Sequence, residues 1–159
     1  MRDKRFVAVH RGGPLTKENH HKLMKWARVC SEHVLSLIDG NIDPRLTNAL
    51  QVAKAWENGQ ATVGDARKAS IAAHATAREF SDPASIAVAR SVGHAVATAH
   101  MADHSPGAAL YALKAVKLAG KSTDKEREWQ YKQLKKLVPE MVELVLNTMM
   151  IKETTGFKI

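Results

Sequence analysis

The segment from residue 61 to residue 119 most constrains the fold, because alanine fills it. Nineteen of its 59 residues are alanine, against five among the other 100 residues of the chain. Alanine has the highest helix propensity and leaves almost no side chain between packed backbones. The segment therefore predicts closely packed helices. No part of the chain alternates convincingly between apolar and polar residues as a half-buried strand does.

Helix start and stop signals divide the chain further. Asp43-Pro44 and Asp82-Pro83 each combine an N-cap with a proline in the first turn. Thr62 is a third N-cap, and Ser105 and Thr123 are expected to cap two later helices. These signals predict an all-α bundle, or stacked helical hairpins, of six to seven helices. The expected ranges are 16 to about 39, 44–59, 62–80, 83–103, 105–120 and 123–151, with Pro139 kinking or dividing the last one.

The length of 159 residues fits one domain with a buried core. We expect an N-terminal arm over residues 1–15, a helical domain over residues 16–151 and a loose C-terminal tail over residues 152–159. The longest apolar run, Ala108 to Leu113, is far too short to span a bilayer. Cys30 is the only cysteine, which excludes an internal disulfide and favours a cytoplasmic location.

The net charge of +8 is unevenly distributed. Residues 1–28 carry +6 (eight Lys/Arg, two acids) and residues 114–136 carry +5 (eight and three), whereas residues 29–113 carry −2 (six and eight). These basic segments suit an acidic protein partner or a solvated surface. Neither segment contains an RNA-reading aromatic motif or a zinc-finger spacing, so we do not expect nucleic-acid binding. A homo-oligomer remains open.

His100 and His104 are the one pair with a spacing suited to a shared metal ion. Residues four apart lie on one face of a helix, as in helical zinc sites. His94 lies about 80° away from His104 around such a helix, and no third ligand can be identified. We therefore expect no cofactor, and we favour hydrogen bonds from these histidines to helix ends or neighbouring helices.

A second set of residues could bind an anion. Arg67, His74 and Arg78 lie on one face of the third predicted helix, and Arg90 and His94 form an Arg/His pair on the fourth. Arginine side chains match both carboxylates and phosphates. The two helices could therefore line one ligand-binding pocket. The alternative is a structural network in which the bases pair with nearby acids, namely Asp65, Glu79 or Asp82.

Sequence patterns of known catalytic sites are missing. The chain has no GxSxG, no phosphate-cradling GxxxxGK[ST] and no dinucleotide-binding glycine motif. A Tyr111–Lys114 pair could move protons, but no cofactor motif accompanies it. We therefore expect a binding protein rather than an enzyme, and we name no catalytic residue.

Several motifs taken in order resemble a known family. They are Trp26-Ala-Arg-Val-Cys-Ser-Glu-His33, Asp43-Pro-Arg45, Ala55-Trp-Glu-Asn-Gly59, Ala73-His-Ala-Thr-Ala-Arg78, Gly93-His-Ala-Val-Ala-Thr-Ala-His100 and Tyr111-Ala-Leu-Lys-Ala115. Over roughly residues 20–120 the chain resembles the bacterial immunity-protein family with an immunity-protein-5-like helical domain. The resemblance implies a small cytoplasmic protein that binds a toxin and blocks it. It implies no catalytic residues.

Overall fold

The computed structural model describes residues 2–159, and its fold is all-α, as the sequence predicts. The only β-type pairing in these residues is an isolated bridge between Ala8 and Leu15. Short 3-10 helices connect or precede several of the α-helices. The α-helices are α1 (Lys17–His33), α2 (Pro44–Glu57), α3 (Val63–Glu79), α4 (Pro83–Ala97), α5 (Ser105–Leu118), α6 (Thr123–Leu137) and α7 (Val142–Thr154).

Most helix starts follow the predicted caps. The side chains of Asp43 and Asp82 accept backbone N–H groups at the starts of α2 and α4, and Thr62 forms a complete capping box with α3. Two predicted caps are wrong. Ser122, not the residue after it, caps α6. Ser105 is the first residue of α5, and its hydroxyl donates to the Ala102 carbonyl.

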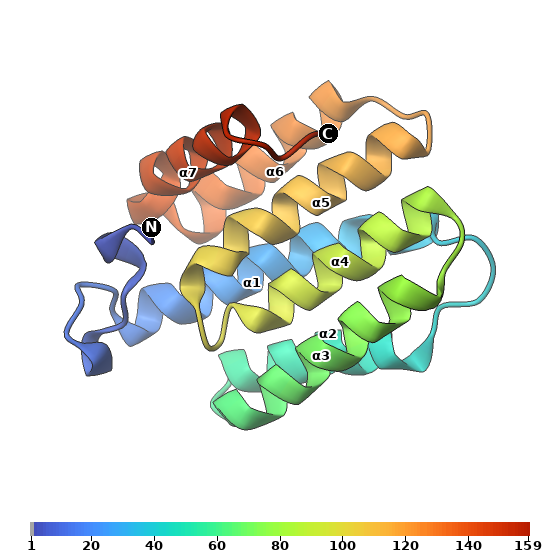
Figure 1. The fold of residues 1–159 in the computed structure, drawn as a ribbon. Helices are drawn as coiled ribbons and strands as arrows, with labels where there is room; N and C mark the ends of the chain where they lie inside the picture. The colour runs from blue at the N-terminus through green and yellow to red at the C-terminus, as the bar shows by residue number, and fades with distance from the viewer. Residues whose placement is uncertain (1) are drawn as a thin grey trace.

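Helix α4, with its small apolar residues, lies at the centre of the molecule. It packs against α1, α2, α3 and α5, and Figure 1 shows it between α3 and α5. Ala27 of α1, Ala95 of α4 and Ala108 of α5 form one fully buried cluster. Alanine therefore lets three helix backbones approach one another closely.

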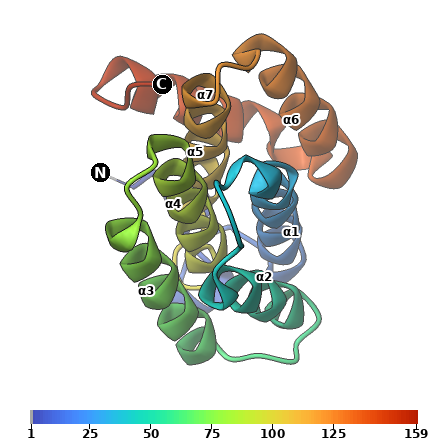
Figure 2. The ribbon, with the colours of Figure 1, turned by 90° about the vertical axis from the view of Figure 1, so that its right-hand side faces the viewer.

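Two larger apolar clusters flank this centre. One joins α1, α2, α3, α4 and α5, and it includes Trp56 and Val88. The other joins the N-terminal arm, α1, α5, α6 and α7 and includes Phe6, Trp26 and Leu134. Figure 2 shows α6 and α7 on the side of the molecule opposite α3. Phe6 is only 2% exposed, so the N-terminal arm packs on the helical domain through this side chain.

Two helices end earlier than predicted. Helix α1 ends at His33 and is followed by a 3-10 turn, and α4 ends at Ala97 instead of near residue 103. At the end of α4 an imidazole nitrogen of His20 lies 2.6 Å from the Thr98 carbonyl oxygen. A contact from α1 thus satisfies a free carbonyl at this helix end. The chain then turns back, and this turn decides where His104 lies.

Pro139 divides the last predicted helix. Helix α6 ends at Leu137, a 3-10 helix covers Pro139–Met141, and α7 follows. The residues beyond the predicted domain boundary at 151 continue α7 to Thr154, and the Phe157 ring packs edge-on against Tyr111 at 4.9 Å between centroids. None of the helices in residues 2–159 combines the length and hydropathy that a bilayer span requires.

Candidate functional site

The four histidines of the alanine-rich segment lie together. Ring centroids are 5.3 Å apart for His74 and His94, 5.2 Å for His94 and His104, and 5.4 Å for His100 and His104. The rings therefore form one continuous series from α3 across α4 to the turn before α5. We call these four residues the histidine cluster.

This arrangement corrects the angular argument made from the sequence. In a straight helix His94 would lie about 80° from His104 and contact it only loosely. Because α4 ends at Ala97, the chain folds back, and Nδ1 of His104 lies 3.1 Å from Nδ1 of His94. His100 lies in the turn after α4 and belongs to no helix. The prediction that His100 and His104 share one helical face is therefore wrong, although the two rings are neighbours.

Hydrogen bonds define the protonation of the cluster. Nη1 of Arg90 lies 2.9 Å from Nδ1 of His74. Arginine can only donate, so His74 accepts at Nδ1 and its ring carries a proton at Nε2. In the contact between His94 and His104 one Nδ1 donates and the other accepts, so the two neutral rings are opposite tautomers.

Two glycines make room for the rings. A Cβ on Gly93 would lie 2.6 Å from Cε1 and Nε2 of His74. A Cβ on Gly107 of α5 would lie 3.0 Å from Nδ1 of His94. The space above Gly93 is therefore filled by an imidazole ring.

Tyr111 forms the α5 side of the site. Its ring stacks on His94 with centroids 5.1 Å apart, and Phe157 packs against its edge. The ammonium of Lys114 lies 5.6 Å from the centroid of Phe157. From the sequence, Tyr111 belongs to a proton-transfer pair with Lys114 and to one of the family motifs, and neither predicts a stacked ring. Its stacking depends on a histidine 17 positions earlier, a contact that no local spacing predicts.

The cluster is built to hold neutral imidazoles. Burial is the main cause that lowers the pKa of His74 to about 4, and the charge of Arg90 lowers it further. Burial also lowers the pKa of His94 to about 3, with His104 and His74 as further causes. The pKa values of His100 and His104 are lowered chiefly by burial as well. Protonation of the cluster is therefore opposed at neutral pH.

Further cations surround the cluster. Beyond burial, which lowers these pKa values most, Arg67 contributes to the low pKa of His100 and Arg78 to that of His74. Lys152 of α7 likewise contributes to the low pKa values of His94 and His104. Within residues 2–159 none of these three cations, nor Arg90, forms an ion pair. The site is therefore electropositive, and Arg67 and Arg78 are exposed beside it.

The acids proposed to satisfy these bases are engaged elsewhere. The structural network predicted between them and the Arg/His set does not form. The carboxylate of Asp65 accepts the backbone N–H of Thr62, and the Thr62 hydroxyl accepts the backbone N–H of Asp65. Glu79 pairs with Arg45, and Asp82 accepts the backbone N–H and the hydroxyl of Ser85.

Polar atoms next to His104 lack partners in the structure. Nδ1 of His100 and Oδ1 of Asp103 are buried and form no hydrogen bond to residues 2–159. No group of three or more His, Cys, Asp or Glu side chains in this part of the chain has an arrangement that could hold a metal ion. The His100–His104 pair thus gains no third ligand from the fold.

A family match accompanies this geometry. The family model described as "Imm-5 like putative immunity protein" matches residues 13–137, and the chain belongs to this family. The match contains the whole histidine cluster and α1 to α6, whereas α7 lies beyond it. No curated protein and no solved structure matches the chain.

Proposed function

We propose that the protein is a non-enzymatic immunity protein that binds a protein toxin in the cytoplasm and blocks its activity. The observation that carries this proposal is family membership over residues 13–137, most of the chain. The two basic segments support it, since they would steer and hold an acidic face of the partner.

Co-production tests this function. Toxin candidates encoded beside the gene are produced in a sensitive bacterial host, alone and together with this protein. Restored growth with one candidate, and recovery of a stoichiometric complex from the same cells, are the expected results. The proposal fails if every neighbouring toxin remains fully active and none is recovered with the protein.

Binding of a small anion at the histidine cluster is a second candidate function. It is favoured by the cations Arg67, Arg78 and Arg90, which lack carboxylate partners in residues 2–159. The guanidinium groups near His74 match a phosphate or carboxylate. The His94 ring packs edge-on against the ring of His74.

Inorganic phosphate is the probe for this second function. It should raise the melting temperature of the protein, and Arg90→Gln should abolish the increase. Lys68→Gln removes an exposed charge from α3, the helix of Arg67 and Arg78, and should leave the increase unchanged. An equal increase in both variants would mean that phosphate acts non-specifically and would remove this candidate.

A further inference from the structure

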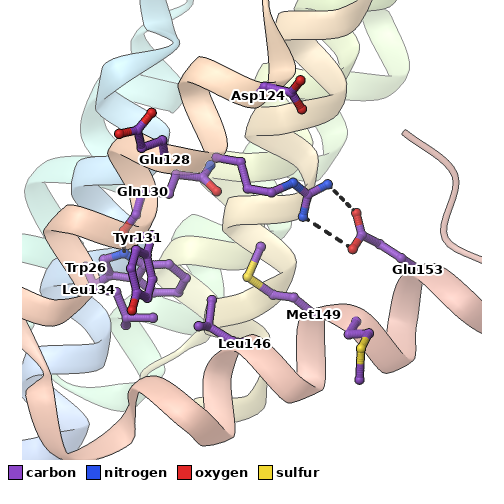
Figure 3. A pocket seen from close by; sticks show the side chains of 11 residues that line it. Trp26, Asp124, Glu128, Gln130, Tyr131, Leu134, Leu146, Met149 and Glu153 are labelled. Atoms are coloured by element: carbon purple, nitrogen blue, oxygen red, sulfur yellow. Dashed lines mark hydrogen bonds and ion pairs between the residues drawn. The ribbon is translucent and has the colours of Figure 1, made fainter.

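Helices α6 and α7 enclose a pocket outside the histidine cluster. Its volume is about 550 Å³, within the range of ligand pockets. Figure 3 shows aromatic and aliphatic side chains on its walls, with Tyr131 and Leu134 from α6 and Leu146 and Met149 from α7. Trp26 of α1 is buried beside them and donates its Nε1–H to the Gln130 carbonyl. The pocket is therefore apolar, and residues on three helices line it.

Helix α7 carries apolar side chains on its buried side and also on exposed sides. Its residues Leu144, Val145 and Met149 are buried in the core cluster shared with α5. Leu146 and Met150 line the pocket and remain 37% and 56% exposed. A helix that is apolar on nearly all sides is normally covered on all sides. The pocket side of α7 is one of its uncovered sides, and Ile151, 50% exposed, lies outside the pocket.

An ion pair joins the two walls. The guanidinium of Arg127 on α6 donates to both carboxylate oxygens of Glu153 on α7, at 2.6 and 3.3 Å. Figure 3 shows this pair as dashed lines at one end of the pocket. A bidentate pair of this kind fixes geometry as well as adding energy. The pocket is therefore held open before any partner arrives.

The charges around the pocket are opposite to those of the chain as a whole. Three acids line it, Asp124, Glu128 and Glu153, against the single base Arg127. Glu128 also pairs at 3.3 Å with Lys132, one turn along α6. The whole chain carries +8, and most of α6 lies in the basic segment 114–136, so the acidic rim of this pocket is a local exception within a basic surface. It complements a partner that carries positive charge beside apolar side chains.

We propose that the α6–α7 pocket docks an amphipathic segment of a protein partner, with an apolar stripe flanked by Lys or Arg. Tyrosine and methionine are enriched at the centres of protein interfaces, and Tyr131 and Met150 supply them here. That the natural partner is the toxin rests on the proposed function. The docking surface itself does not depend on that function. Helix α7 lies outside the family match, whereas α6 lies inside it.

A pair of synthetic peptides tests the surface without the toxin. Both peptides have about 18 residues, enough for a marginal helix, and carry the same leucine stripe. The polar positions are lysine in one and glutamate in the other. A chain of charge +8 attracts the glutamate peptide through its overall field, so preference for the lysine peptide would report the local acidic pocket.

Binding is measured by calorimetry and mapped by amide chemical shifts of the full chain. The lysine peptide should bind more tightly than the glutamate peptide, with the largest shifts in α6 and α7. Leu146→Glu and Met150→Glu should each weaken binding of the lysine peptide about tenfold or more. The matched control is Ile71→Glu, at a 64% exposed position on α3, which should leave binding unchanged. Unchanged amide spectra away from the substitution show that each variant is folded.

Three results would overturn the proposal. They are tighter binding of the glutamate peptide, shifts centred on other helices, and a homodimer that Leu146→Glu dissociates, which would make a second copy the occupant. Because no toxin enters the experiment, its failure leaves the immunity function untouched. Conversely, failure to protect cells leaves the peptide result standing.

Discussion

The substitution Gly93→Ala tests whether the helix packing is built around the His74 ring. The new Cβ would lie 2.6 Å from two ring atoms and 2.9 Å from a third, closer than real Cβ contacts allow. The ring cannot move away without breaking its 2.9 Å hydrogen bond to Arg90. Overpacking of this kind costs about 1–3 kcal/mol, more than the gain of up to about 1 kcal/mol that alanine brings to a helix interior.

We therefore expect Gly93→Ala to lower the free energy of unfolding by about 1–2 kcal/mol in urea denaturation. In a His74→Ala background the space is empty, and the same substitution should stabilise by about 0.5–1 kcal/mol. Gly64→Ala in the first turn of α3 is the control, because its nearest neighbour is the Thr62 hydroxyl at 3.6 Å. It should stabilise slightly in both backgrounds. If Gly93→Ala had the same effect with and without His74, the steric argument would be refuted.

Three more outcomes are expected. Because the pKa of His94 is lowered to about 3, the unfolded chain binds more protons below pH 6.5, and stability should fall by about 2 kcal/mol between pH 8 and pH 5 in urea titrations. His74 is only partly buried, so it should contribute less to this loss of stability. A stability that stays constant between pH 8 and pH 5 would contradict burial of His94 in its neutral form. Trp26→Phe should cost about 1–3 kcal/mol in the same assay, since the Gln130 carbonyl loses its donor. Finally, Arg127→Met should free Glu153 and broaden α7 amide signals, whereas sharp, unshifted signals would show that the pair does not fix the pocket.

The fold was largely predictable because its signals are local. Asp43-Pro44 and Asp82-Pro83 specify helix starts through atoms a few residues apart, and the structure uses both. The end of α4 was not predictable in this way. Residues 98–103 contain no strong helix breaker, and the termination at Ala97 coincides with a contact from His20, 78 positions away from Thr98. Long-range contacts of this kind leave no periodic trace in the sequence.

The site was predictable in its members but not in its connections. Helical spacing grouped Arg67, His74 and Arg78 on one helix and paired Arg90 with His94 on the next, and a hydrogen bond joins Arg90 to His74. That these residues bind an anion stays a prediction. The contact between His94 and His104 depends on the turn after α4, which the sequence analysis missed. The α6–α7 pocket was missed for a similar reason, because it depends on how Pro139 divides the last helix.

Titration of the partner toxin with the purified protein tests the central claim most directly. A non-enzymatic immunity protein should reduce toxin activity linearly, reaching complete inhibition at one molar equivalent, with the complex eluting as a single species. Loss of toxin activity at a small fraction of an equivalent, with continued turnover, would show that the protein acts as an enzyme. Full toxin activity at several equivalents would contradict neutralisation by binding.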